Sequence, residues 1–336
     1  MKIAVLGAGT WGMALARMLA NTGHDVTVWS AVKAEIEELK TTGRQKNLPD
    51  MELPASMRYT LELEEACTEK DIVLFAVASV YVRATAKNAA PFIPDGQVIV
   101  NVSKGIEPDT LKTMTQIIEE EMRGAGREHA KYVALSGPTH AEEVARDQPT
   151  LAVSACDDPE TAKLVQGVFM NPNMRVYTNK DVTGVELCGA VKNIIALASG
   201  ISSGLGYGDN AKAALITRGI AETARLGIAM GCDEHTFYGL AGIGDMIVTA
   251  TSVHSRNFTC GVLIGQGMKT EEAVKQVGMV VEGINAIPAV KELLKRHGIE
   301  MPIVEAVDAI INAGENPRDK VLFLMTREGR GEWQDA

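Results

Sequence analysis

The sequence is poor in aromatic residues, which make up only 4% of its 336 residues, so small aliphatic side chains must form most of the core. Hydrophobic residues nevertheless make up 46% and charged residues 23%, which is the balance of an ordinary globular protein. A chain of this length exceeds the usual size of one domain. We therefore expect two domains.

Cysteines are few, and no two of them form a CxxC pair. The five are scattered along the chain: Cys67, Cys156, Cys188, Cys232 and Cys260. This distribution argues against a disulfide framework and against a cysteine-rich metal site, and it suits a reducing cytosol. The six histidines are equally dispersed and form no HExxH pair. We expect no metal.

A run of positive charge is also missing. The net charge is −10, so nucleic acid is not an expected partner. No apolar run reaches the ~20 residues that cross a bilayer, so we expect no membrane insertion. The apolar start over Lys2–Leu6 mimics a secretory signal, but Gly7, Gly9 and Gly12 interrupt it and the pattern continues into a regular fold. We expect a cytoplasmic protein.

The first half of the chain contains a regular alternation of β-like and helical segments. Thr10–Asn21 has apolar residues at helical spacing and is ended by Gly23. The expected strands are Lys2–Leu6, Asp25–Trp29, Asp71–Ala76, Gln97–Val100, Tyr132–Leu135 and Thr150–Val153. Such alternation predicts a Rossmann-like, doubly wound parallel sheet, which we assign to residues 1–180.

The second half shows helix periodicity with many glycines and alanines. The expected helices are Val182–Ser202, Ala211–Met230, Phe258–Gly265, Thr270–Gln276, Gly283–His297 and Met301–Ala313. We therefore predict that residues 181–336 form an all-helical substrate and catalytic domain. Because no flexible linker separates the halves, we expect the two domains to pack tightly around a cleft.

Three glycines form a GxGxxG pattern between the first strand and the first helix. Gly7 permits a tight turn, Gly9 lets the backbone approach a pyrophosphate, and Gly12 allows close contact between helix and strand. The positive end of the helix then faces the phosphates. The setting favours a dinucleotide-binding turn over a glycine-rich turn without a ligand.

The end of the second strand leaves the cofactor undecided between NAD and NADP. An acidic residue there would bind a ribose 2′-hydroxyl, whereas an arginine would accept a 2′-phosphate. The strand is followed by Ser30, Ala31, Val32 and Lys33, and Asp25 lies at its wrong end. Ser30 and Lys33 tolerate a phosphate, but they are equally compatible with plain surface residues.

One lysine, Lys192, lies on an apolar face of the helix predicted over Val182–Ser202. A buried ammonium is costly unless it reaches a cleft or a partner. Desolvation would lower the pKa of Lys192 and make it usable as a base near neutral pH. The alternative is a lysine whose methylene stem reaches solvent. Asn193 beside it can bind a ligand or cap a loop.

Two loops that follow predicted strands are suited to binding anions. Lys104 lies at the carboxyl end of a strand, where ligands bind in α/β sheets, although a surface lysine in a turn has the same spacing. Ser136–Ala141 opens a helix whose free amides can bind an anion or a carboxamide. Ordinary N-capping by Ser136 or Thr139 remains the alternative there.

Two polar or glycine-rich islands interrupt the helical half. Ser255–Asn257 combines a guanidinium with a helix N-terminus, which makes a good phosphate site. In Ala241–Asp245 the carboxylate of Asp245 can cap a helix or orient a catalytic lysine. A solvated loop is the alternative for both islands.

Taken together, these segments resemble the bacterial-type NAD(P)-dependent glycerol-3-phosphate dehydrogenase family from Lys2 to about Ala313. The similar blocks are GAGTWGMALA (Gly7–Ala16), VSKGIE (Val102–Glu107), LSGPTHAEE (Leu135–Glu143), GVELCGAVKNIIALASG (Gly184–Gly200), GDNAKAALITRG (Gly208–Gly219), GLAGIGDM (Gly239–Met246) and SRN (Ser255–Asn257). The resemblance implies a helical domain of the 6-phosphogluconate-dehydrogenase C-terminal type, a homodimer, and a supply of glycerol 3-phosphate for phospholipid synthesis.

The resemblance also implies roles for individual residues. Cofactor contacts are implied for Gly7, Gly9, Thr10, Trp11, Gly12, Lys104, Ala141, Arg256, Val280 and Glu282. Substrate contacts are implied for Lys104, Gly137, Thr139, Lys192, Asp245, Ser255, Arg256 and Asn257. Lys192 would accept or donate the proton. The chain departs from many relatives at Ala31, where they carry arginine or histidine, and at Ala78, where they carry proline.

Two other functions are compatible with this pattern. A dehydrogenase of the same architecture that acts on a β-hydroxy acid or a sugar acid would need cations placed for a carboxylate. A cofactor-binding regulatory protein without turnover would have no use for a desolvated base, so Lys192 argues against it.

Overall fold

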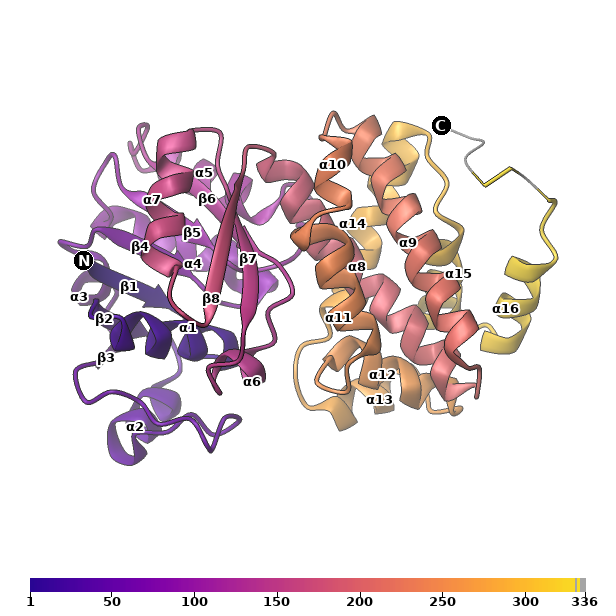
Figure 1. Cartoon of the computed structure of the whole chain (residues 1–336), viewed down its shortest axis with the longest axis horizontal. Helices are drawn as coiled ribbons and strands as arrows, with labels where there is room; N and C mark the ends of the chain where they lie inside the picture. The colour runs from indigo at the N-terminus through magenta and orange to yellow at the C-terminus, as the bar shows by residue number, and fades with distance from the viewer. Residues whose placement is uncertain (330, 333–336) are drawn as a thin grey trace. The chain divides into compact units, whose positions relative to one another are not determined.

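The computed structural model describes residues 1–329, 331 and 332. The chain splits into two compact units (Figure 1). The N-terminal unit contains Met1–Lys104 and Lys112–Val182, and the helical unit contains Gly105–Leu111 and Thr183–Ala336.

The N-terminal unit is built on one eight-stranded sheet with the order β3-β2-β1-β4-β5-β6-β7-β8. Its strands are β1 (Lys2–Leu6), β2 (Asp25–Trp29), β3 (Arg58–Thr60), β4 (Ile72–Phe75), β5 (Val98–Asn101), β6 (Lys131–Ser136), β7 (Thr150–Ala155) and β8 (Met174–Asn179). All six predicted strands are confirmed, with bounds that differ by at most two residues. The edge strands β3 and β8 were not predicted.

The prediction of a wholly parallel sheet is wrong at one pair, because β7 runs antiparallel to β6. The only helix between these strands is α6 (Ala141–Val144). Its four residues span about 6 Å, whereas a parallel crossover must return along a strand of about 20 Å. The chain therefore turns back beside β6.

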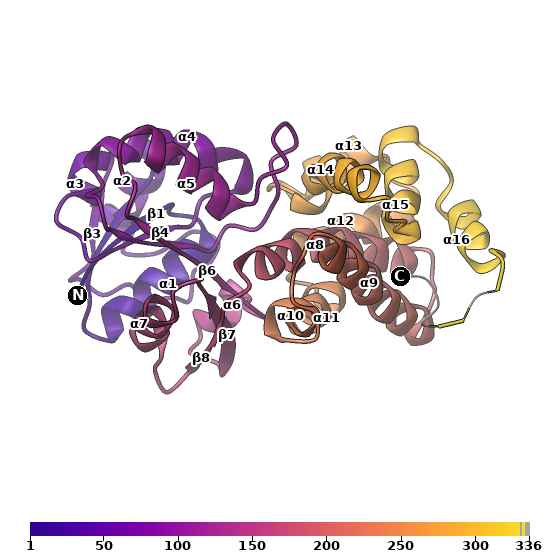
Figure 2. The ribbon, with the colours of Figure 1, turned by 90° about the horizontal axis from the view of Figure 1, so that it is seen from above.

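Helices cover both faces of the sheet, which is why its central strands are continuously apolar. An apolar core joins α1 (Thr10–Asn21) and α7 (Pro159–Phe169) to one face. A second core joins α3 (Leu63–Cys67), α4 (Val82–Ala89) and α5 (Met114–Gly124) to the other face (Figure 2). The remaining helices of this unit are α2 (Lys33–Thr42) and the 3-10 turns η1 (Ser79–Tyr81) and η2 (Ala90–Phe92).

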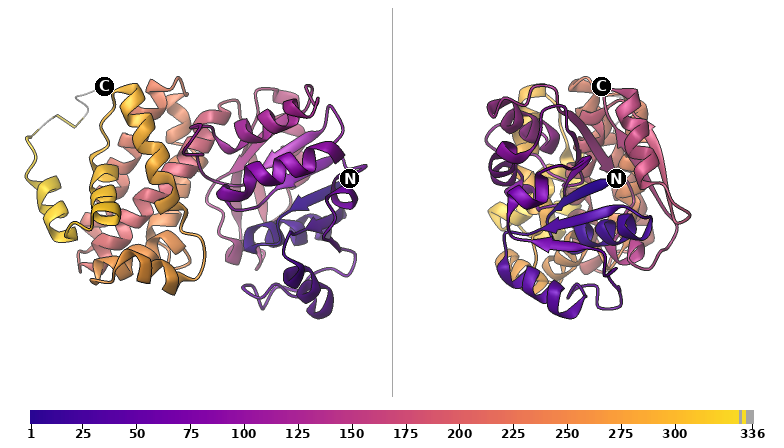
Figure 3. Two further views of the ribbon diagram at one scale, coloured as in Figure 1. Left: turned by 180° about the vertical axis from the view of Figure 1, so that it is seen from behind. Right: turned by 90° about the vertical axis from the view of Figure 1, so that its left-hand side faces the viewer.

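Every named element in the described part of the helical unit from Thr183 onward is a helix (Figure 3). The elements are α8 (Val182–Gly204), α9 (Asp209–Ala229), α10 (Glu234–Phe237), η3 (Leu240–Gly244), α11 (Asp245–Thr251), α12 (Arg256–Gly265), α13 (Thr270–Val277), α14 (Glu282–His297), α15 (Pro302–Ala313) and α16 (Pro317–Met325). The six predicted helices are confirmed to within two residues at each end. The sequence did not predict α10, η3, α11 or α16.

The helix α8 forms the centre of this unit. It is long and apolar enough to cross a membrane by length and composition, contrary to the expectation that no segment would be. However, the whole of its apolar window is buried inside the fold. Burial on all sides is what a core helix of a globular domain requires.

Glycines bring α8 and α12 into unusually close contact. A Cβ atom on Gly200 would lie 2.1 Å from the carbonyl oxygen of Phe258, and one on Gly261 would lie 2.3 Å from that of Leu197. Real Cβ atoms do not approach so closely, so both positions require glycine. The contact holds the N-terminal end of α12 at a fixed place beside α8.

One buried carboxylate, Glu222 on α9, lies at the start of α15. The residue is only 3% exposed, and its Oε2 accepts a hydrogen bond from the Ile303 amide at 3.2 Å. Burial raises the pKa of Glu222 to about 7, although this hydrogen bond and the nearby Arg225 and Arg218 lower it. A carboxyl group with this pKa links stability to pH.

We predict that Glu222→Gln flattens the pH dependence of stability. The folded state of the wild type binds an extra proton between the ordinary glutamate pKa of 4.5 and about 7, so stability falls as pH rises through that window. The loss is up to about 3 kcal/mol. Urea unfolding of both proteins at pH 5 and pH 8 measures it, and equal pH slopes would contradict the prediction.

Candidate active site

The three glycines of the first turn have the different environments that dinucleotide binding needs. Gly7 has a φ of +125°, and a Cβ on it would lie 2.6 Å from the Ala76 carbonyl oxygen. A Cβ on Gly12 would lie 2.3 Å from the Gly7 oxygen, so helix and strand meet closely there. Gly9 has no atom within 4 Å of its would-be Cβ, which leaves space for a close ligand. The turn fits a pyrophosphate.

This turn lies at the topological switch point of the sheet. The chain runs from β1 to β2 on one side and later to β4 on the other, so the crevice opens at the carboxyl ends of β1 and β4. Gly7 also donates its amide to the Trp29 oxygen at the end of β2, at 2.8 Å. Thr10 and Trp11 begin α1, whose N-cap Gly9 offers no side-chain cap. The first amides of a helix have no acceptor within it, so this end of α1 can bind an anion.

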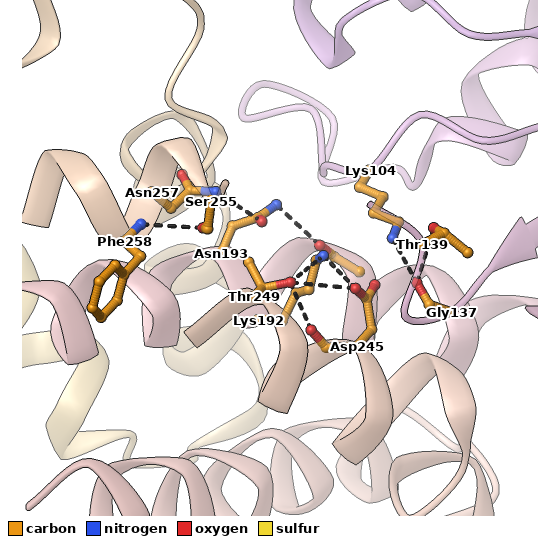
Figure 4. Close-up of polar contacts among 11 residues, drawn as sticks. Lys104, Gly137, Thr139, Lys192, Asn193, Asp245, Thr249, Ser255, Asn257 and Phe258 are labelled. Carbon is orange, nitrogen blue, oxygen red and sulfur yellow. Dashed lines mark hydrogen bonds and ion pairs between the residues drawn. The ribbon is translucent and has the colours of Figure 1, made fainter. Parts of the chain in front are cut away.

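The structure also brings Lys104, Gly137 and Thr139 together in the N-terminal unit (Figure 4). The ammonium of Lys104 donates to the Gly137 oxygen at 3.4 Å, and the Thr139 hydroxyl donates to the same oxygen at 3.1 Å. Gly137 has a φ of +143°, a conformation that favours glycine. Ala141 is the first residue of α6 and is buried. These residues follow the ends of β5 and β6.

In the helical unit, Lys192 is buried and paired (Figure 4). Its side chain is only 8% exposed, so the alternative of a stem reaching water is wrong. The ammonium donates to Asp245 Oδ1 at 2.5 Å and to the Thr249 hydroxyl at 2.8 Å. Asp245 is itself only 1% exposed. The carboxylate stabilises the ammonium and so opposes the effect of desolvation.

Thr249 is a residue that the sequence did not single out. Its hydroxyl donates to the Asp245 carbonyl oxygen at 2.6 Å, which leaves an oxygen lone pair directed at Lys192. The alternative of a solvated loop over Ala241–Asp245 is wrong, because the chain forms the π-helical turn η3 and then enters α11 at Asp245. Asp245 and Thr249 are four positions apart and so share one face of a helix, and this spacing was the available signal for Thr249.

The phosphate-site candidates lie at the beginning of α12. Ser255 is the N-cap, and its hydroxyl oxygen accepts a hydrogen bond from the Phe258 amide at 3.2 Å. Arg256 is the first helical residue and its side chain is exposed. A helix N-terminus beside a guanidinium is a favourable site for a phosphate group.

The side chain of Asn257 connects three helices. Its amide nitrogen donates to Asn193 Oδ1 at 3.0 Å, and its Oδ1 accepts from the Gly283 amide at 2.8 Å. A Cβ on Gly283 would lie 2.5 Å from the Asn193 carbonyl oxygen, so α14 approaches α8 only because this residue is glycine. Val280 and Glu282, which precede Gly283, are partly buried. The sequence did not identify Gly283.

A dinucleotide-binding turn and a buried lysine–aspartate pair in a helical unit are typical of dehydrogenases that use a nicotinamide cofactor. The models of the N-terminal and C-terminal parts of NAD-dependent glycerol-3-phosphate dehydrogenase match residues 2–162 and 181–322. The chain belongs to this family.

Relatives in this family match over almost the whole chain. One is a glycerol-3-phosphate dehydrogenase (NAD(P)+) 2 of Lactobacillus delbrueckii subsp. bulgaricus, which is 64% identical over 98% of both chains. Another is a glycerol-3-phosphate dehydrogenase (NAD(P)+) of Fusobacterium nucleatum, 49% identical over 99% of both. The crystal structure of glycerol-3-phosphate dehydrogenase from Coxiella burnetii superposes with a TM-score of 0.92 at 34% identity, covering 97% of this chain and 99% of that one.

Proposed function

We propose that the protein interconverts dihydroxyacetone phosphate and sn-glycerol 3-phosphate with NAD or NADP, and so supplies glycerol 3-phosphate for glycerophospholipid synthesis. The buried Lys192, held by Asp245 and Thr249, is the observation that carries the proposal. Membership of the family over both units supports the substrate. A dehydrogenase acting on a hydroxy acid would need further cations in place of the phosphate site at α12.

Lys192 is the proton donor and acceptor of this reaction. In the reductive direction its ammonium donates a proton to the oxygen that develops negative charge at C2 of the substrate. In the oxidative direction the neutral amine takes the C2 hydroxyl proton. The bound nicotinamide supplies the hydride chemistry. Asp245 and Thr249 orient the amine, and proton transfer of this kind contributes ~10²–10⁴ in rate.

We predict that the wild type oxidises NADH or NADPH with dihydroxyacetone phosphate and that Lys192→Ala loses at least ~10²-fold in kcat. Cofactor oxidation should be followed separately with each cofactor. Binding of the cofactor to the variant, measured by fluorescence, should persist because Lys192 acts on the substrate. Near-normal turnover of the variant would remove Lys192 from the mechanism, and no wild-type turnover would sink the proposed function.

The substrate phosphate is held at the beginning of α12. Arg256 supplies a guanidinium, Ser255 and Asn257 shape the first turn, and the turn's backbone amides add donors. Lys104, Gly137 and Thr139 of the N-terminal unit also contact the substrate in this proposal. A phosphate held away from the reacting carbon orients that carbon.

We predict that Arg256→Ala raises KM for dihydroxyacetone phosphate about tenfold or more, since a guanidinium–phosphate contact is charge-assisted. Arg296→Ala, which removes an exposed arginine in the last turn of α14, serves as the matched control. Steady-state kinetics of both variants decide the point. An unchanged KM in the Arg256 variant would contradict its assignment.

The proposed cofactor site contains residues from the glycine turn and from later segments. Its members are Gly7, Gly9, Thr10, Trp11, Gly12, Lys104, Ala141, Arg256, Val280 and Glu282. The φ of Gly7 and the open space at Gly9 support the part of the site at the glycine turn.

A homodimer in the cytoplasm completes the proposal. In the helical unit a groove of about 860 Å³ lies among α9, α15 and α16 and is lined mainly by apolar side chains. The helix α16 exposes Leu322, Phe323 and Met325, which is unusual for a helix surface in water. The five cysteines are scattered along the chain with no CxxC pair, and four of them are buried, which suits a reducing compartment.

The dimer prediction is testable by mass. Light scattering should give twice the 35.9 kDa of one chain, because the groove and the exposed face of α16 would cover each other in a symmetric pair. Phe323→Asp should shift the population toward monomer. A wild type that remains monomeric at all concentrations would exclude the dimer.

A further inference from the structure

A carboxylate from α2 lies at the end of β2, although no acidic residue directly follows that strand in the sequence. Ser30, the residue after β2, is buried at 5% exposure. Its hydroxyl donates to Glu35 Oε2 at 2.6 Å and accepts a hydrogen bond from the Val32 amide at 3.1 Å. Glu35 belongs to the first turn of α2, five positions further along. The side chain of Glu35 therefore folds back to the strand end.

This strand end is directly connected to the glycine turn. The amide of Gly7 donates to the oxygen of Trp29, the last residue of β2, at 2.8 Å. In a sheet of this kind the pyrophosphate lies at the glycine turn and the adenosine ribose reaches the end of the second strand. Ser30 and Glu35 are thus placed where the ribose 2′ position would lie.

The neighbouring strand end is acidic as well. At the end of β3, the Thr60 hydroxyl donates to Glu65 at 2.5 Å and accepts from the Glu62 amide at 3.0 Å. The Ser30 amide donates to the Thr60 oxygen at 3.4 Å, so the two strand ends are adjacent. The nearest lysine on α2, Lys33, is exposed and already pairs with Glu37.

We propose that Glu35, oriented by Ser30, makes this enzyme prefer NAD over NADP; the inference rests on the proposed function of the glycine turn as the cofactor site. A carboxylate accepts the hydrogen bond of a ribose 2′-hydroxyl. A 2′-phosphate at the same place carries about two negative charges and is repelled by Glu35 and, further away, by Glu65. No arginine stands among residues 30–33, directly after β2, to offset this repulsion, and Ala31 stands next to Ser30.

A purely structural role for Glu35 makes a different prediction. A carboxylate in the first turn of α2 also stabilises the helix through its dipole. Loss of that stabilisation would lower the melting temperature and weaken NADH and NADPH binding by the same factor. The ratio of the two affinities, in contrast, changes only if Glu35 acts on the 2′ position.

The experiment measures binding of NADH and NADPH separately by fluorescence titration, and kcat/KM for each with dihydroxyacetone phosphate. The wild type should bind NADH at least about tenfold more tightly than NADPH. In Glu35→Gln this ratio should fall about tenfold, mainly because NADPH binds better. Glu37→Gln removes the same charge from the same helix, where it pairs with Lys33, and should leave the ratio unchanged.

A gain-of-function variant completes the test. Ala31 is exposed, so Ala31→Arg places a guanidinium beside the strand end without disturbing the core, and it should tighten NADPH binding while NADH binding stays the same. Equal wild-type affinities, or an unchanged ratio in Glu35→Gln, would overturn the inference. Turnover of dihydroxyacetone phosphate with either cofactor would then leave the proposed function standing, whereas failure to bind both would overturn both.

Discussion

The buried contact between Lys192 and Asp245 is the interaction on which the helical unit depends most. Both side chains are almost fully removed from water, and the two residues lie 53 positions apart in the sequence, on different helices. Removing one partner of such a pair leaves an uncompensated charge, at a cost of about 3–5 kcal/mol. The unit must therefore hold α8 and α11 in register. This requirement explains why the helices around the apolar helix α8 pack so closely against it.

Glycines, which have no side chain, make that close packing possible. In a chain with few aromatics, Gly200 and Gly261 let α8 and α12 touch through their backbones. Gly7 and Gly12 do the same for β1, β4 and α1 in the N-terminal unit. In both units, close backbone approach places a helix N-terminus beside residues that can bind a ligand. Close backbone contacts at glycines thus support both the proposed cofactor site and the proposed substrate site.

The elements that the sequence predicted best are those whose burial is uniform. The bounds of β1, α1 and β2 matched because continuous apolar runs and a helical period leave little choice. The edge strand β8 was missed because its alternating burial mixes polar and apolar residues. Lys192 could be identified as an isolated charge on an apolar face. Its partner Thr249 was missed, because its spacing from Asp245 shows only that the two share a helix face, and tertiary packing alone brings Thr249 to Lys192. Glu35 was overlooked since its side chain turns back along the chain.

The side-chain amide of Asn257 limits which substitutions members of the family can accept around it. Its oxygen serves the backbone of Gly283 and its nitrogen serves the side chain of Asn193. Replacing Asn257 would leave both of its partners without this bond, and replacing Asn193 would leave the Asn257 amide nitrogen without its acceptor. A Cβ at Gly283 would instead clash with the Asn193 carbonyl oxygen. The three are therefore expected to change together or not at all as sequences drift. Their joint identity would be a marker for this arrangement in distant relatives whose overall similarity has faded.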